Sequence, residues 1–468
     1  MVPLTLHDFE RDALDTLTTY ATIECLSPAF DDQWAAHGHL DAAVELLAQW
    51  ARQRSLGDFR VEVVRLEGRT PLLMVTVAPT NDDDATVLLY GHLDKQPPLG
   101  EWSTGLAPYD PVRRGDRIYA RGVADDGYAV FAALLALEQL VATGSPHPRF
   151  VVLIEASEES GSPDLDAYLD HLADHLGRVE LMVCLDSGAL TYDRLWVTTS
   201  LRGLASVEIT VEVLTRGQHS GSVSGVVPSS FRVLRQLLDR VEDATTGRVL
   251  LEELHGPIPS HALAAAKEVA QEFGESLTST LPVLEGVRLM GEDVADRILN
   301  QTWRPTMSVV GMGGIPAPED AGNVLRASTT ALLSFRLPPN VDSGLACAAL
   351  ERALGRDVPE GARVTLRTHG ANGWSTPEVA PWLARALEEA SQVAFGRGAA
   401  FTAEGGTIPF LASLGRRYPG VQFVATGVLG PDSNAHGIDE MLDLPCAVSV
   451  TNAVAHILGA FITRKAFR

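Results

Sequence analysis

The chain has 468 residues, of which 37 are Lys or Arg and 60 are Asp or Glu, so its formal net charge is −23. Hydrophobic residues make up 46% and charged residues 21%, which is an ordinary balance for a folded protein and excludes a disordered chain. The negative charge argues against nucleic acids and anionic membranes as partners, because both bind basic surfaces. At roughly 150 residues per domain, the length allows two or three domains.

The cysteines and the N-terminal segment give no sign of secretion or of a membrane anchor. The cysteines are scattered and form no CxxC motif, so the sequence offers neither a disulfide framework nor a thiolate zinc site. The opening segment MVPLTLHDFERDALDTL is amphipathic and lacks a signal-peptide pattern. The longest apolar stretch, identified at residues 131–142, is too short to span a bilayer. We therefore expect a cytoplasmic protein.

Over residues 60–200, short apolar runs alternate with helical patterns. The runs predict strands at 61–66, 72–77, 86–90, 150–154 and 181–185, and the helical patterns lie at 127–143 and 163–175. Runs this apolar are typical of strands buried on both faces of a sheet. The segment therefore predicts an α/β fold with a mostly parallel sheet flanked by helices.

The hydrophobic pattern then changes to strict alternation. Strands with one exposed face are predicted at 206–213, 327–337 and 362–368, and helices near 229–241, 260–272 and 342–355. The buried-strand pattern returns with a helix near 380–395, a strand at 421–426 and a last helix near 445–463. We interpret residues 1–201 and 373–468 as one α/β domain, interrupted by an inserted α+β domain at 202–372.

Histidine or carboxylate side chains follow three of the buried strands and begin one helix. They are His92, Asp94, Asp125, Asp126, Glu158, Glu159 and Asp186, in the segments GHLD, ARGVADDG, EASEE and LDSG. Ligands in open α/β sheets gather beyond the carboxyl ends of the strands. Taken singly, each residue has an ordinary structural explanation, such as a helix cap or a buried histidine. Their coincidence at one sheet edge favours a functional site.

Crowded carboxylates repel one another unless cations neutralise them. Imidazole together with carboxylate suits zinc, manganese or cobalt, whereas cages made of oxygen alone suit calcium and magnesium. The sequence therefore predicts a transition-metal site. With two ions, such a site can share a carboxylate and activate a bridging water. Other chemistries fare worse: neither HExxH nor GxSxG occurs, and GMGG at 311–314 lacks the spacing of a dinucleotide loop.

The segments GHLD, ARGVADD, EASEESGS and LDSG, in this order, resemble the dinuclear metallopeptidase family of aminoacylase, carnosinase, glutamate carboxypeptidase and succinyl-diaminopimelate desuccinylase. The resemblance covers nearly the whole chain. It implies a zinc-exopeptidase-like catalytic domain with an inserted lid through which two chains form a homodimer. Gly127 and Tyr128 depart from the family, which often has Lys and Gly there, and the lost ammonium should leave this edge more negative.

The resemblance also implies two divalent metal ions, with zinc expected first and manganese or cobalt as alternatives. His92 and Asp186 would hold one ion, Glu159 and His436 would hold the other, and Asp125 would bridge them. His436 lies in the segment PDSNAHGIDE, where no local pattern marks it as a ligand.

Two further residues would act beside the metal ligands. Asp94 would orient the imidazole of His92, which lies two residues earlier in the sequence. Glu158 would be the general base that takes a proton from the bridging water and passes it to the leaving amine.

The resemblance assigns substrate-binding roles to a second set of residues. His219, in GQHSG, would reach across the dimer and donate to the oxyanion of the tetrahedral intermediate. Arg336 would pair with a substrate carboxylate, or form a structural ion pair instead. Asn323, Gly406 and Thr407 would complete the substrate site.

The function that these residues favour is metal-dependent hydrolysis of the amide bond of dipeptides or short peptides. The long lid is closer to carnosinase-like dipeptidases than to the smaller bacterial members. Two alternatives stay open: a deacylase of N-acetyl or N-succinyl amino acids, and a metal-binding homologue without catalysis. The expected partners are a small peptide or N-acyl amino acid and a second copy of the chain.

Overall fold

The computed structural model describes residues 1–279, 281–406 and 409–464. Thr407 therefore lies outside the described residues. The chain divides into two compact units: the first comprises Met1–Thr199, Thr376–Phe401 and Ser413–Arg468, and the second comprises Ser200–Ser375 and Thr402–Ala412.

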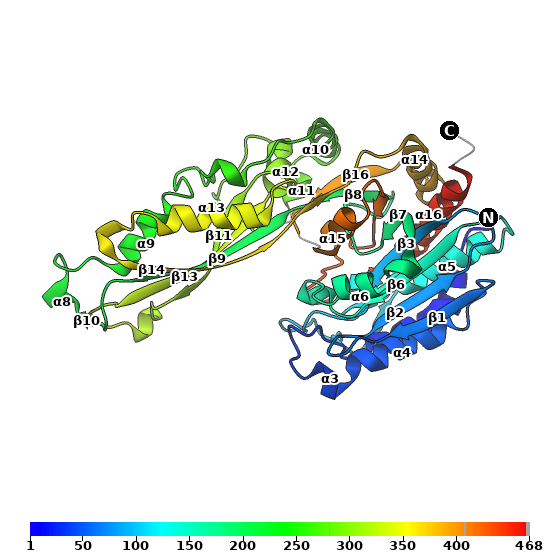
Figure 1. The fold of residues 1–468 in the computed structure, drawn as a ribbon, viewed down its shortest axis with the longest axis horizontal. Coiled ribbons are helices and arrows are strands. Elements are labelled where there is room, and N and C mark those ends of the chain that lie inside the picture. The colour runs from blue at the N-terminus through cyan, green and yellow to red at the C-terminus, as the bar shows by residue number, and fades with distance from the viewer. Residues whose placement is uncertain (280, 407–408, 465–468) are drawn as a thin grey trace. The chain divides into compact units, whose positions relative to one another are not determined.

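The main sheet is mixed and flanked by helices (Figure 1). Its order is β1 (Phe59–Val64), β2 (Leu72–Val77), β6 (Arg149–Glu155), β3 (Ala85–His92), β7 (Arg178–Cys184), β17 (Gln422–Ala425), β8 (Trp196–Leu201) and β15 (Trp374–Ser375), with β16 (Ala400–Glu404) also paired to β8. The neighbours from β6 to β17 are parallel. This confirms the predicted α/β fold with a parallel centre.

Both edges of this sheet are antiparallel, which the sequence pattern did not predict. β1 pairs with β2, β2 with β6, and β17 with β8 in the antiparallel sense. The loop between β1 and β2 is too short for the crossover that a parallel pair needs, so the two strands form a hairpin.

The hydrophobic core of the first unit lies against one face of this sheet. It includes side chains from α4 (His39–Ala51), α5 (Ala129–Val141), α14 (Pro381–Phe395) and α16 (Leu444–Thr463). Val87 and Leu89 of β3 face this core, while Leu88 and Tyr90 alternate to the opposite face and are buried as well. β3 is therefore buried on both faces, as its apolar run predicts.

Helix α16 has 20 residues and is longer than the stretch at residues 131–142, which was therefore wrongly identified as the longest apolar stretch. Among the described residues, α16 is the helix that is long and apolar enough to cross a membrane by length and composition, and 61% of its apolar window is buried inside the structure. It packs against α5 and α14. The helix is therefore accounted for as a core element of the first unit.

The second unit contains a four-stranded antiparallel sheet. Its order is β11 (Thr306–Gly313), β13 (Ser328–Leu337), β9 (Gly203–Glu212) and β14 (Arg363–Ala371). Alternate residues of β9 are buried, and they form a core with α9 (Ser230–Leu238) and α13 (Ser343–Gly355). The three alternating strands predicted for this region are present.

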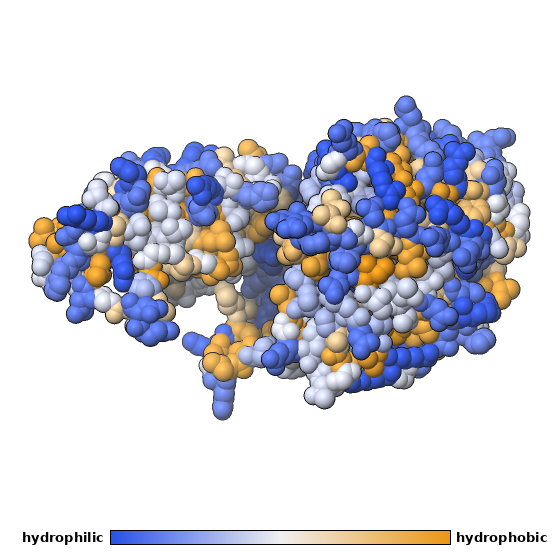
Figure 2. Space-filling model, turned by 90° about the horizontal axis from the view of Figure 1, so that it is seen from below, coloured by the Kyte–Doolittle hydropathy of each residue, from blue (hydrophilic) through white to orange (hydrophobic). Residues whose placement is uncertain are grey.

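Edge strand β11 was not predicted. Its sequence TMSVVGMG mixes apolar residues with glycines, and its pairing shifts register between Val309 and Gly311, so no regular alternation is visible. Val310 and Met312 on this strand are 60% and 46% exposed. Figure 2 shows hydrophobic side chains among hydrophilic ones on the surface of the second unit.

Further helices and strands complete the fold. They are α1 (Leu6–Phe9), α2 (Asp15–Ala21), α3 (Trp34–His37), α6 (Leu165–His171), α7 (Ala173–Leu176), α8 (Ser220–Val223), α10 (Ser260–Phe273), α11 (Ser276–Ser279), α12 (Val294–Thr302), α15 (Pro409–Arg417), and the strands β4 (Val112–Arg114), β5 (Arg117–Tyr119), β10 (Gln218–His219), β12 (Val324–Leu325) and β18 (Met441–Asp443).

Candidate active site

Parallel pairing brings the carboxyl ends of β6, β3 and β7 to one edge of the sheet. His92 at the end of β3 lies opposite Glu155 at the end of β6, and Tyr90 lies opposite Cys184 at the end of β7. The residues that follow these strands therefore meet. We use the name His–carboxylate cluster for His92, Asp94, Asp125, Glu158, Glu159, Asp186 and His436, which all belong to the first unit.

Two overlapping groups within the cluster have the geometry of metal ligands. His92, Glu158 and Asp186 form one group and His92, Asp125 and Glu159 form the other, with the candidate ligand atoms of each group within 4.8 Å of one another. His92 Nε2 lies 3.8 Å from Asp186 Oδ2.

Asp125 lies between two imidazoles. Its Oδ1 is 3.1 Å from His92 Nε2, and its Oδ2 is 3.0 Å from His436 Nε2. His436 Nε2 is also 3.2 Å from Glu159 Oε2. One carboxylate thus offers one oxygen to each histidine, which is the arrangement that a bridging ligand requires.

Asp94 supports both the imidazole and the glutamates. Its backbone carbonyl lies 3.1 Å from His92 Nδ1, and its carboxylate accepts hydrogen bonds from the backbone N–H groups of Glu158 at 3.1 Å and Glu159 at 3.0 Å. The second contact was not predicted. It fixes the turn that presents the two glutamates.

Sequence reasoning missed Gln96 and assigned no role of its own to Asp126. Gln96 donates from Nε2 to Glu159 Oε2 at 2.7 Å, and no local pattern indicates this contact. Asp126 accepts the backbone N–H of His92 at 3.1 Å. A Cβ on Gly91 would lie 2.6 Å from Asp126 Oδ2, so this strand position has room only for glycine.

Burial and mutual repulsion raise the pKa values of the glutamates. Burial raises the pKa of Glu158 well above its usual range, and the nearby Asp186 carboxylate adds to this. Burial also raises the pKa of Glu159, with Asp125 as the next contribution. The protein thus holds more carboxylates here than it can leave ionised without a compensating cation.

Hydrogen bonds between the histidines and the carboxylates also shift the pKa values of His92, His436 and Asp125. Burial alone would raise the pKa of Asp125, but hydrogen bonds from His436 and His92 outweigh it and lower that pKa. Hydrogen bonds to Asp125 and Glu159 raise the pKa of His436 to about 11. Burial opposes charge on His92, yet Asp125 and Asp94 raise its pKa well above the usual value. The neighbouring carboxylates therefore favour the protonated form of both imidazoles.

The donor set fits divalent metal ions. Asp125 and Asp186 are only 6% and 8% exposed, and the cluster combines imidazole nitrogens with carboxylate oxygens. This combination suits first-row transition metals such as zinc, manganese and cobalt. Because buried carboxylates need a partner, a bound cation would relieve the repulsion that the raised pKa values record.

Metal uptake is expected to release protons, because imidazolium cannot bind a metal. With the pKa of His436 raised from 6.5 to about 11, this ring is protonated at neutral pH in the metal-free protein and must lose its proton on binding. Apparent metal affinity should therefore rise with pH, by about tenfold per pH unit for each proton released. Zinc titrations at pH 6, 7 and 8 in buffers of different ionisation enthalpy measure both quantities. A pH-independent affinity would contradict protonated histidine ligands.

The predicted substrate residues in the second unit form two groups. His219 on β10 pairs with Val324 on β12, and the backbone N–H of Ser220 donates to Asn323 O at 2.8 Å, so His219 and Asn323 lie together. Val324 precedes the first residue of β13, whereas Arg336 lies near the last residue of that strand, opposite Leu204. The structure therefore does not bring His219 and Arg336 of one chain together.

Arg202 is a second guanidinium near Arg336 that sequence reasoning missed. Burial, followed by the charge of Arg336, lowers the pKa of Arg202 to about 10. Arg202 also donates from Nε to the carbonyl of Gly405 at 3.2 Å, next to the predicted Gly406. Two arginines beside a glycine-rich segment form a setting suited to an anionic group.

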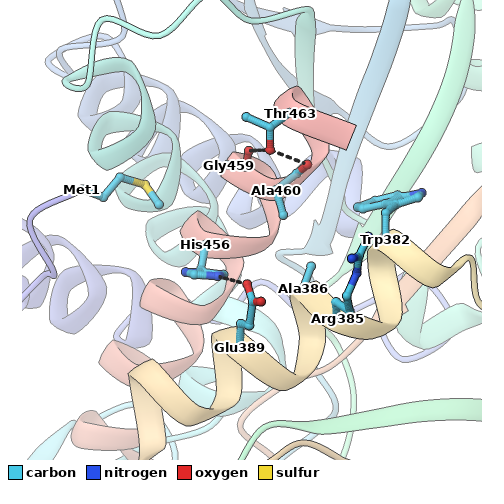
Figure 3. Close-up of a pocket in the computed structure, with 9 residues that line it drawn as sticks. All are labelled: Met1, Trp382, Arg385, Ala386, Glu389, His456, Gly459, Ala460 and Thr463. Carbon is cyan, nitrogen blue, oxygen red and sulfur yellow. Dashed lines mark hydrogen bonds and ion pairs between the residues drawn. The ribbon is translucent and has the colours of Figure 1, made fainter. Parts of the chain in front are cut away.

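A cavity of about 300 Å³ in the first unit lies elsewhere, between α14 and α16 (Figure 3). It is lined by Met1, Trp382, Arg385, Ala386, Glu389, His456, Gly459, Ala460 and Thr463. His456 Nε2 and Glu389 Oε2 are 3.6 Å apart in its wall. The lining contains no residue of the His–carboxylate cluster, so the cluster is identified by its chemistry and not by a cavity.

A mixed α/β sheet with a buried His–carboxylate cluster at the ends of its parallel strands defines a metal-dependent hydrolase. The chain belongs to peptidase family M20/M25/M40, whose model matches residues 88–460. This confirms the family resemblance carried by the four segments.

Relatives and solved structures agree with this assignment. The chain is 28% identical to a cysteinylglycine-S-conjugate dipeptidase of Corynebacterium striatum, over 77% of this chain and 78% of that protein. It is also 28% identical to a Cys-Gly metallodipeptidase of Saccharomyces cerevisiae, over 77% of this chain and 76% of that one. An M20 family metallo-carboxypeptidase from Sulfolobus solfataricus has the same fold, with a TM-score of 0.78, 21% identity and coverage of 96% and 98%.

Proposed function

We propose that this peptidase hydrolyses dipeptides with two divalent ions, zinc first, held by the His–carboxylate cluster. The observation that carries the proposal is Asp125, which offers one oxygen to His92 and the other to His436. The names of the two dipeptidase relatives support a dipeptide substrate. Asp186 would complete the first metal position and Glu159 the second.

Glu158 would be the general base. When bound, the metal ions polarise the scissile carbonyl and lower the pKa of the attacking water. The Glu158 carboxylate would accept the proton of that water and return it to the leaving amine. Its position depends on Asp94, which accepts the backbone N–H of Glu158 at 3.1 Å. Neighbouring cations would lower the raised pKa of Glu158 and so favour the ionised form that a base requires.

Arg336 would bind the free carboxylate of the substrate. Its guanidinium presents donors in a planar fork that matches a carboxylate. The position of Arg202 beside it would increase the positive potential at this subsite. Gly406 and Thr407 would add contacts from the adjoining segment, and Asn323 would act with His219.

We also propose that the protein is a homodimer formed through the second unit, which would serve as an inserted lid and dimerisation domain. His219 pairs with Val324, which precedes β13, whereas Arg336 lies near the C-terminal end of that strand. At about 3.3 Å per residue, β13 from Ser328 to Arg336 spans roughly 25 Å. A dipeptide spans only about 7 Å. His219 of one chain would therefore serve a substrate bound by Arg336 of the other.

Edge strand β11 offers a surface for this contact, since no strand among the described residues pairs with its outer side. Val310→Asp places a charge at a 60% exposed apolar position and is expected to shift the protein toward monomer. Light scattering after size-exclusion chromatography measures the mass. Thr365→Asp, on the opposite edge strand β14, is the matched control and should stay dimeric. A monomeric wild-type protein would refute the dimer.

A substrate panel tests the proposed function. Protein stripped with chelator is given zinc, manganese or cobalt, and is assayed with dipeptides and with N-acetyl and N-succinyl amino acids. Metal-restored release of amino acids from dipeptides is the expected result. Cleavage of the acylated compounds alone would make the protein a deacylase. Two bound ions without activity on any compound would favour the non-catalytic alternative.

A further inference from the structure

Glu440 is a buried carboxylate whose four hydrogen-bond donors all come from the segment that carries Asp125. The residue has 0% exposed surface. Its Oε2 accepts from Arg121 Nη1 at 2.7 Å and from the backbone N–H of Gly122 at 2.9 Å. Its Oε1 accepts from the backbone N–H groups of Ala124 at 3.1 Å and Asp125 at 3.2 Å. Each oxygen therefore has two donors.

Arg121 completes the connection on the other side. It is 1% exposed, and while one nitrogen binds Glu440, Nη2 donates to the backbone carbonyl of Gly437. Gly437 directly follows His436. The buried pair thus ties the backbone of Asp125 to the backbone next to His436, although the two segments are distant in the sequence.

We propose that Glu440 and Arg121 are positioning residues that hold Asp125 and His436 at the spacing needed by the metal ion that Glu159 and His436 would bind. The inference rests on the proposed two-metal function. A buried ion pair is a weak source of net stability, because desolvation offsets much of the attraction. Its distinctive effect here is geometric, since the side-chain hydrogen bonds of both residues are made to the two ligand-bearing segments.

The effect should be larger at this second metal position than at the first. The backbone N–H of His92 is held by Asp126, and its ring lies against the carbonyl of Asp94, so the first position has supports independent of Glu440. His436 is 54% exposed at its side chain and depends more on its backbone for placement. Loss of a group that supports a ligand typically costs 10–100-fold in metal affinity.

Glu440→Gln is the sharpest test, because the amide cannot satisfy the site in either orientation. Its NH2 group would face either Arg121 and Gly122, or Ala124 and Asp125, and all of these are donors. We expect roughly 10–100-fold weaker binding of one of two zinc ions, measured by chelator competition. The visible spectrum of the cobalt-loaded protein should change too, since it reports ligand geometry. Urea unfolding shows whether the variant is folded.

Asp439→Asn is the matched control. This neighbouring carboxylate accepts the backbone N–H of Ser103 at 2.9 Å, and among the described residues it has no recorded hydrogen bond to the His–carboxylate cluster. Both zinc affinities should therefore equal those of the wild type. Arg121→Lys is the second variant. It keeps the charge but lacks the fork that reaches both Glu440 and Gly437, so a smaller loss at the same ion is expected.

The outcomes separate the inference from the proposed function. A wild-type protein that binds no zinc would refute the proposed metal site and the inference with it. If the wild type binds two ions, unchanged affinities and cobalt spectrum in folded Glu440→Gln would overturn the inference alone. An equal loss at both ions would overturn it as well. Should Glu440→Gln fail to fold, Arg121→Lys is judged by the same criteria.

Discussion

Glu158→Gln is expected to remove nearly all peptide hydrolysis while leaving both metal ions bound. A positioned general base contributes about 10²–10⁴-fold to the rate, and the amide of glutamine cannot accept the proton of the attacking water. Metal binding should survive, because the neighbouring ligands His92 and Asp186 are unchanged and His92 keeps its contact with Asp125. Turnover number and metal content per chain are the two quantities to measure.

Glu389→Gln is the matched control for this experiment. Glu389 is also a glutamate of the first unit, but its carboxylate lies 67% exposed beside His456, in the wall of the separate cavity. Its replacement should leave turnover and metal content unchanged. Full activity in Glu158→Gln would exclude Glu158 as the base, and loss of metal from that variant would make it a ligand instead.

The strand ends explain why much of the cluster could be predicted from the sequence. His92, Glu158 and Asp186 each follow an apolar run that forms a buried strand, and parallel strands end at the same edge of their sheet. Local pattern and fold class together were therefore enough to bring these side chains together. The structure confirms this part of the fold and places the residues within ligand distance of one another.

Contacts that join distant segments left no local signal. His436 lies in a loop, with a φ of 61°, and only the family resemblance marked it as a ligand. Nothing near Glu440 or Arg121 indicates that they pair, because their contact depends on how the chain returns to the sheet edge. Strand β11 was missed for a different reason: its glycines and its register shift interrupt the alternation that identifies strands.

The second unit shows a further limit of local patterns. The alternating strand at 327–337 predicted that Arg336 lies in a sheet, and the structure contains that strand as β13. The pattern carried no information about which residues of the second unit would lie near it. The proximity of Arg202, which lies between β8 and β9, became visible only in the fold. The substrate roles of Arg336, His219, Asn323, Gly406 and Thr407 stay predictions.

Asp125→Asn should have the largest effect on metal binding, because both proposed ions share this carboxylate. Neutralising it removes the negative charge, and the amide must turn its NH2 group toward His92 or His436. We expect a loss of affinity for both ions that exceeds the 10–100-fold typical of a supporting residue. The bridging assignment therefore predicts a coupled loss, in contrast to the selective loss expected for Glu440→Gln.

Thermal unfolding with and without zinc measures this loss independently of catalysis. A ligand at about 100 times its Kd stabilises the folded state by about 2.7 kcal/mol, so wild-type protein should melt at a higher temperature when zinc is added. Asp125→Asn should show little of this shift, whereas Asp439→Asn should keep it. A variant that loses one ion and retains the other at wild-type affinity would show that Asp125 serves a single metal. Asp125 would then not bridge two ions, and the proposed two-ion mechanism would lose its bridging ligand.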